Sequence, residues 1–184
     1  MSIGVFIAFE RAEAPSTFLE DLNSDTMILT LASPAFEEGG MIPSKFTCDA
    51  DNVSPEMRIG GVPEGTVSLV LVMDDPDIPD SVKQSRGIEK FDHWAVYNIP
   101  ADTAVIQEGE VIGMGAMNGR GEASYTGPCP PDREHRYFFR LYALSGTLNF
   151  LQAPTLDELE AAAKGSMLGS ATLMGRYNRI ESRE

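Results

Sequence analysis

The chain has 184 residues, of which 42% are hydrophobic, and its 28 acidic and 14 basic side chains give a net charge of −14. This length and composition fit one domain with its own core. Such an acidic chain repels nucleic acid and anionic membrane surfaces unless lysines and arginines cluster locally, and the sequence has no run of them. We therefore expect no nucleic-acid partner.

Residues 1–26 differ from the rest of the chain, because a brief apolar run is followed there by the polar stretch FLEDLNSDT. A second methionine, Met27, stands just before the strand-like MILTLAS. We predict a weakly ordered extension over 1–26 and one domain over 27–184. If translation starts at Met27, this extension lies upstream of the true start.

From residue 27 onward, apolar segments alternate with turns rich in Gly, Pro, Asn and Asp, a pattern typical of β-strands. The strongest strand predictions, rich in β-branched and aromatic residues, cover 66–74, 93–99 and 135–144. The turn-rich segments between them are longer than simple hairpins need, which is typical of functional loops; they cover 75–92, 100–126 and 127–134.

The C-terminal part contains the signals of one helix. Thr155 and Glu158 form the pattern T-x-x-E of a capping box, and LEAAAK follows with high helix propensity. We expect Gly165 to weaken or end this helix, and we predict a last strand over 171–179.

Acidic residues and a histidine stand where two predicted strands meet. Prolines stiffen the segment DDPDIP after the first strand, so it is either a rigid, solvated turn or a turn with one carboxylate that faces inward. If the first two strands are antiparallel neighbours, Asp75 and Asp77 lie near Asp92 and His93. Either His93 is a structural side chain, or an inward carboxylate orients it.

His135, the second of two histidines, opens the third strand. Strand alternation places it on one face with Tyr137 and Phe139, so Tyr137 is either a core aromatic beside His135 or part of a shared site. Just upstream, GPCPP at 127–131 is either a surface turn or the preformed wall of a pocket.

The segments DPDIP, HWAVYNIP, GPCPP and HRYFFRLYAL, in this order, resemble signature segments of the phosphatidylethanolamine-binding protein family, in its bacterial and archaeal Raf kinase inhibitor-like branch. The resemblance covers roughly 27–179 and includes FTCDADNVSPEMRIGGVP. It implies a mostly β fold, in which a large antiparallel sheet packs on a smaller one, with a helix near the C-terminus. It also implies a pocket for a small anion such as phosphate, a carboxylate or a phospholipid head group.

Carried over by motif position, the resemblance assigns ligand binding to Asp75, Asp77, Pro79, His93, Cys129, Pro130, Pro131, His135 and Tyr137. Ile78 departs from the family pattern, since relatives have a smaller residue there, and Ile59 stands where relatives commonly have Trp. The resemblance further implies a protein partner, such as a kinase or protease that is inhibited, and homodimers among bacterial relatives.

Two imidazoles beside one anion favour their charged forms, although burial opposes this. With an Asp on one ring nitrogen, the other nitrogen faces the ligand, and Tyr137 can donate its hydroxyl proton. We expect this pocket to need no Arg or Lys, and to bind phosphate monoesters more strongly as the pH falls from about 8 to about 6.

The alternative is an enzyme in which Asp and the two histidines bind a metal or perform acid–base chemistry. No metal-binding histidine spacing and no G-x-S-x-G nucleophile motif supports that alternative. We therefore expect a binding protein that is not an enzyme and needs no metal and no cofactor.

The cysteines bear on the location of the protein. Cys48 and Cys129 are far apart and match no metal-binding spacing, so we interpret them as two thiols in a reducing cytoplasm, with one long-range disulfide as the alternative. No segment approaches the roughly 18 apolar residues of a membrane span, and the N-terminus lacks the basic region of a signal peptide. We expect a cytoplasmic protein with no membrane span.

Overall fold

The computed structural model describes residues 28–179, so the predicted extension over 1–26 lies outside the described residues. Two antiparallel sheets and two helices make up the fold, as the resemblance implied. The larger sheet has the strand order β6-β4-β3-β7-β8, and the smaller sheet has the order β1-β2-β5. The mostly β fold class predicted from the sequence is therefore confirmed.

The strands of the larger sheet are β3 (Ser68–Asp75), β4 (Phe91–Pro100), β6 (Met114–Gly115), β7 (His135–Leu144) and β8 (Met167–Tyr177). The strands of the smaller sheet are β1 (Thr30–Ala32), β2 (Met57–Gly60) and β5 (Val105–Ile106). The helices are α1 (Asp80–Arg86), α2 (Leu156–Ala163) and the short 3-10 helix η1 (Ser44–Phe46).

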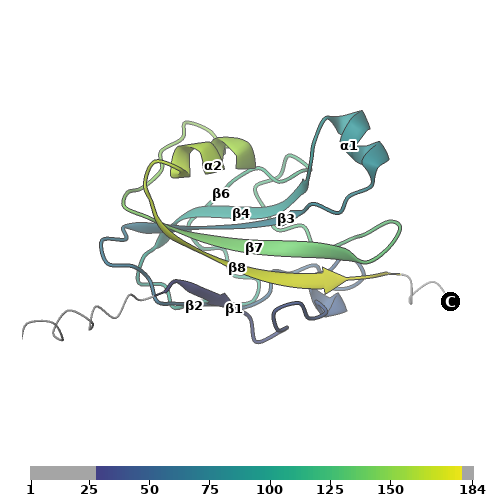
Figure 1. Ribbon diagram of the computed structural model, residues 1–184, viewed down its shortest axis with the longest axis horizontal. Helices are drawn as coiled ribbons and strands as arrows, with labels where there is room; N and C mark the ends of the chain where they lie inside the picture. The colour runs from purple at the N-terminus through teal and green to yellow at the C-terminus, as the bar shows by residue number, and fades with distance from the viewer. Residues whose placement is uncertain (1–27, 180–184) are drawn as a thin grey trace, which may run out of the picture.

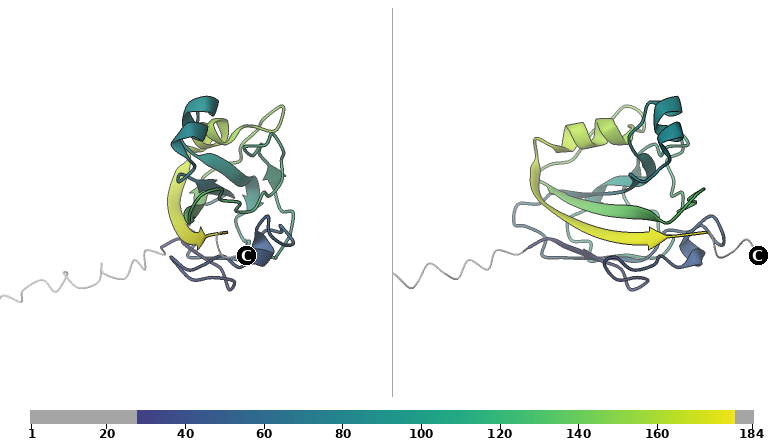
Figure 2. Two further views of the ribbon diagram at one scale, coloured as in Figure 1. Left: turned by 90° about the vertical axis from the view of Figure 1, so that its right-hand side faces the viewer. Right: turned by 45° about the vertical axis from the view of Figure 1, so that its right-hand side comes forward.

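The larger sheet lies between α2 on one face and the smaller sheet on the other (Figure 1). Its central strand β3 is buried on both faces, as expected for an uninterrupted apolar segment. Leu69, Leu71 and Met73 pack into the core between the two sheets. Val70 and Val72 pack into a second core beneath α2. The two further views in Figure 2 show the same layers from the side.

The three strongest strand predictions correspond to β3, β4 and β7, which are neighbours in the larger sheet. The predicted last strand is β8, which begins at Met167, earlier than the sequence indicated. The capping box at the start of α2 is present, because Thr155 accepts a hydrogen bond from the Glu158 amide and the Glu158 carboxylate accepts one from the Thr155 amide. The helix ends at Ala163, just before Gly165.

Helix α1 lies inside the segment 75–92 that the sequence predicted as a loop. None of its residues is buried, so its sequence DSVKQSR carries no apolar periodicity that would have indicated a helix. Pro79 precedes its first residue, and Gly87 ends it in the left-handed conformation with a φ of 67°. The α1 connection matters for function because it supplies one side of the cavity described below.

The interpretation of the cysteines as two free thiols is wrong. Cys48 and Cys129 form a disulfide with a Cα–Cα distance of 5.5 Å across a sequence separation of 81 residues. The fold places their segments side by side, and the Cys48 amide donates to the Pro128 carbonyl oxygen over 3.1 Å. Disulfides persist mainly in oxidising compartments, so the cysteines no longer support a reducing cytoplasm.

None of the helices in residues 28–179 has the length and hydrophobicity that crossing a lipid bilayer requires.

Candidate ligand-binding site

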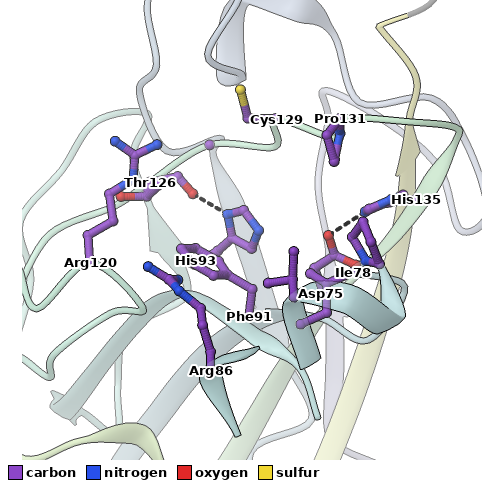
Figure 3. Close-up of a pocket in the computed structure, with 13 residues that line it drawn as sticks. Asp75, Ile78, Arg86, Phe91, His93, Arg120, Thr126, Cys129, Pro131 and His135 are labelled. Carbon is purple, nitrogen blue, oxygen red and sulfur yellow. Dashed lines mark hydrogen bonds and ion pairs between the residues drawn. The ribbon is translucent and has the colours of Figure 1, made fainter. Parts of the chain in front are cut away.

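A cavity of about 480 Å³ lies at the end of the larger sheet where β3 ends and β4 and β7 begin (Figure 3). Of the residues that the sequence assigned to the site, the structure brings six into its lining: Asp75, Pro79, His93, Cys129, Pro131 and His135. Antiparallel pairing explains this convergence, because the last residue of β3 lies beside the first residues of its two neighbours.

Asp75 and His135 form a nearly fully buried ion pair at one side of the cavity. The Asp75 Oδ2 atom lies 2.7 Å from His135 Nδ1, and Asp132 Oδ1 lies 2.9 Å from His135 Nε2. A carboxylate can only accept, so both ring nitrogens carry protons and the imidazole is charged. Burial by itself lowers the pKa of His135, but the hydrogen bonds to both carboxylates outweigh it and leave that pKa raised.

His93 reaches the same face of the sheet as Asp75 through an irregularity in β4. Met73 pairs with Trp94 but Asp74 pairs with Asp92, so His93 is an extra residue in β4, as in a β-bulge. Its ring lies 4.8 Å from that of Phe91 and 5.2 Å from that of Tyr137, measured between centroids. Bulges of this kind redirect side chains next to functional sites.

The protonation state of His93 depends on its burial. Its Nδ1 atom lies 2.6 Å from the Thr126 carbonyl oxygen, so Nδ1 carries the proton. Burial lowers the pKa of His93 to about 4, despite the opposing effects of that hydrogen bond and of Asp75. His93 is therefore neutral at neutral pH, and its Nε2 atom points toward the centre of the pocket as an acceptor (Figure 3). At His93 the effect of burial, which opposes the charged form, is the larger one.

Tyr137 lies between the two histidines, with ring centroids 5.2 Å from His93 and 6.5 Å from His135. It is fully buried, and burial is the main reason why its pKa is raised above the usual range for tyrosine. Its hydroxyl has no hydrogen-bond partner among the described residues. Tyr137 is not among the residues that line the cavity, but an unsatisfied hydroxyl beside His93 and His135 can donate to a ligand or a water molecule that reaches it.

Two other residues of the predicted set lie beside the cavity rather than in its lining. The Asp77 carboxylate accepts two hydrogen bonds of 2.8 Å from the Arg136 guanidinium, which hold the pKa of Asp77 down to about 2. Pro130 is buried in the loop that carries Cys129 and Pro131. Ligand binding by Asp77 and Pro130 stays a prediction.

Sequence reasoning missed the two arginines of the cavity. Arg86, the last residue of α1, and Arg120, from the loop after β6, both line it. Figure 3 shows both side chains on the side of His93, with Asp75 and His135 on the other side. The pocket expected from the sequence contained no Arg or Lys, whereas the lining of this cavity contains two arginines. Both arginines stand in segments predicted as irregular loops, where no periodicity indicates which way a side chain points.

The remaining wall is formed by Ile78, Val82, Phe91, Thr126 and Gly127. Aliphatic and aromatic groups thus lie next to the charged ones, as in most small-molecule sites. Within residues 28–179, no group of three or more His, Cys, Asp or Glu side chains could hold a metal ion.

The family model described as phosphatidylethanolamine-binding protein matches residues 32–178. A UPF0098 protein of Methanothermobacter thermautotrophicus is 39% identical, over 82% of this chain and 99% of its own length. A UPF0098 protein of Aquifex aeolicus is 38% identical, over 83% of this chain and 90% of its own length.

Two solved structures share the fold. A putative phosphatidylethanolamine-binding protein homologue of Chlamydia trachomatis has a TM-score of 0.78 and 38% identity, covering 82% of this chain and 97% of that one. An Escherichia coli protein described as a new member of the mammalian family has a TM-score of 0.71 and 23% identity. The match covers 81% of this chain and 97% of that one. The predicted kinship is thereby confirmed: this chain belongs to the phosphatidylethanolamine-binding protein family, in its bacterial and archaeal branch.

Proposed function

We propose that the cavity binds the phosphate group of a small phosphate monoester, without changing it chemically. The proposal rests on which arginines lack an ion-pair partner. The described residues include eight arginines, of which six pair with a carboxylate: Arg58, Arg133, Arg136, Arg140, Arg176 and Arg179. The other two, Arg86 and Arg120, have no ion pair within residues 28–179, and both line the cavity.

An unpaired guanidinium is unexpected in a chain with a net charge of −14. In the lining, Arg86, Arg120 and His135 carry three positive charges against one negative charge on Asp75, and Asp132, bonded to His135 just outside the lining, brings the sum to +1. A phosphate monoester carries up to two negative charges, and guanidinium groups bind its oxygens through charge-assisted hydrogen bonds. The charge of the cavity therefore matches this ligand class better than a neutral ligand.

The other walls favour an organic substituent on the phosphate. A volume of about 480 Å³ exceeds what a bare phosphate ion fills, and Ile78, Val82 and Phe91 offer apolar contact. The neutral His93 offers an acceptor at Nε2 and Tyr137 offers a donor. Small phosphorylated metabolites and phosphorylated head groups released from phospholipids, such as glycerol 3-phosphate, both have this chemistry.

No observation favours catalysis. Both nitrogens of His135 are bound to carboxylates, so that ring cannot exchange a proton with a ligand without losing a partner. His93, with a pKa of about 4, is a weak base at neutral pH. The kinase or protease partner and the homodimer that the family resemblance implies stay predictions.

Calorimetric titration with glycerol 3-phosphate tests the proposal. Arg86→Gln and Arg120→Gln should each weaken binding about 10- to 100-fold, because each removes a charge-assisted hydrogen bond. Arg58→Gln is the matched control, since Arg58 pairs with Glu56 on the surface, and it should bind like the wild type. An absence of saturable binding to the wild type, or equal affinity in all the variants, would contradict the proposal.

A further inference from the structure

We propose that the Cys48–Cys129 pair is a redox site through which thiols control the affinity of the cavity for its ligand. The inference rests on the anion-binding function proposed above. Cys129 itself lines the cavity, and the disulfide joins it to the segment that follows η1. Cys48 is exposed, so an external thiol can reach this end of the bond. A covalent bond that is accessible from outside thus ends in the wall of the binding site.

The disulfide is one of several links between the wall and the segment after η1. The Gly127 amide donates to Asn52 Oδ1 over 2.8 Å, and the Tyr125 hydroxyl donates to the Phe46 carbonyl oxygen over 2.8 Å. Together with the hydrogen bond from the Cys48 amide to Pro128, these contacts hold the wall at residues 125–128. The disulfide acts one residue further on, at Cys129. On the far side, Asp132 is bonded to His135 and the Arg133 guanidinium donates to the Asp77 carbonyl oxygen. Reduction therefore leaves the fold in place and loosens the short stretch of wall around Cys129 between these two sets of contacts.

The chemistry is a thiol–disulfide exchange with an external dithiol. A thiolate of the dithiol attacks Cys48 Sγ, the S–S bond breaks, and Cys129 leaves with the bonding electron pair and takes up a proton. The second thiol of the dithiol then displaces Cys48 from the mixed disulfide, which releases the Cys48 thiol and closes the oxidised dithiol into a ring. Two electrons pass from the dithiol to the cysteine pair.

The released wall changes the cavity in a way that opposes binding. In the disulfide form, Cys129 is held in position before the ligand arrives, whereas in the thiol form the ligand must order this part of the loop. Ordering a few rotatable groups weakens binding by about three- to tenfold. The oxidised protein is therefore the high-affinity form, and the reduced protein is the low-affinity form.

Titration with glycerol 3-phosphate, followed in amide NMR spectra, measures both forms. Oxidised wild type should bind about three- to tenfold more tightly than wild type in dithiothreitol. Cys48→Ser keeps every cavity-lining residue and should match the reduced wild type. Dithiothreitol should leave the affinity of Cys48→Ser unchanged, which separates the effect of the disulfide from that of the reagent.

Three outcomes would overturn the inference. Equal affinities of oxidised and reduced protein would show that the disulfide does not govern the cavity, while leaving the binding function intact. Loss of amide signal dispersion on reduction and in Cys48→Ser would show that the bond supports the whole fold instead. If the oxidised protein does not bind glycerol 3-phosphate at all, the proposed function fails and this inference fails with it.

Discussion

The Asp75 carboxylate and the His135 imidazole lie 2.7 Å apart across the neighbouring strands β3 and β7, and both side chains are almost completely buried. The other Asp75 oxygen accepts a hydrogen bond from the Asp77 amide. The pair therefore fixes the first turn after β3 as well as the ring of His135. This arrangement makes Asp75 a structural support of the site in addition to a part of its lining.

Replacing Asp75 with Asn should destabilise the protein, because the charge of His135 then loses its most buried partner. We expect the free energy of unfolding to fall by about 3 kcal/mol, as when other buried ion pairs lose one member. Urea denaturation at pH 7 measures it. Asp102→Asn, at an exposed turn, is the control and should change stability by less than about 0.5 kcal/mol. Equal stability of the two variants would show that the pair contributes nothing.

The protonation of His93 should leave a pH-dependent signature. Its pKa is about 4 in the folded protein and about 6.5 in an unfolded chain, so between these values the unfolded state binds the proton more readily. The contribution of neutral His93 to stability is therefore complete above about pH 6.5 and is lost as the pH falls toward 4. The stability difference between wild type and His93→Gln should grow by about 2 kcal/mol from pH 4.5 to pH 7.

The pH dependence of the wild type alone would not isolate His93, because Asp92 also changes its contribution to stability in this pH range. Burial raises the pKa of Asp92 to about 6, so its contribution to stability falls as the pH rises over the same range. Asp92 is present in both proteins, and its effect cancels in the difference. NMR of the ring protons gives an independent check, since His93 signals should not move between pH 8 and 5.5. Titration of His93 near pH 6.5 would refute the assignment.

Gly127 should tolerate no side chain. A methyl group there would meet the Phe46 carbonyl oxygen and would lie 2.8 Å from the Thr47 Cα atom, and neither backbone atom can move aside cheaply. We expect Gly127→Ala to lower the free energy of unfolding by about 1–3 kcal/mol, and to weaken ligand binding by displacing the wall. Gly165→Ala is the control, because nothing lies within 4 Å of the added group. Thermal denaturation and ligand titration of both variants test the prediction. Equal stability and equal ligand affinity of the two variants would contradict it.

Loss of the disulfide should lower stability without unfolding the chain. The bond closes a long loop, with a sequence separation of 81 residues, so it restricts the unfolded state strongly. We expect Cys48→Ser to lower the free energy of unfolding by about 2–4 kcal/mol. Denaturation of wild type in dithiothreitol should give the same value. A reduced protein as stable as the oxidised one would contradict the prediction.

The sequence predicted the elements whose pattern repeats along the chain. The strands β3, β4 and β7 carry enough β-branched and aromatic residues to be recognised, and the capping box marked the start of α2. The proximity of Asp75 and His93 followed from antiparallel neighbours, and the ordered motifs of the family added His135 to the same site.

The features that the sequence did not predict depend on contacts between distant segments. The pairing of Cys48 with Cys129 depends on how two loops lie side by side, which spacing along the chain does not encode. The neutral state of His93 depends on its burial and on the carbonyl of Thr126. Arg120 reaches the cavity from an irregular loop, and such loops have no period from which a direction can be read.

The two-sided burial of β3 has a consequence for how the chain finds its pairing during folding. A strand with one solvent-exposed face is aligned by the alternation of polar and apolar residues. Strand β3 has no solvent-exposed face, and its acidic residues Asp74 and Asp75 both stand at its end. Side-chain shape distinguishes the faces, because Leu69, Leu71 and Met73 face one core and Val70 and Val72 face the other. A shift by one residue would put short branched side chains where long ones belong and would pair Asp74 with Tyr137 or Phe139 instead of Phe138. Alignment of this strand thus depends on fit between side chains, and mutations that equalise their sizes should produce misaligned folding products.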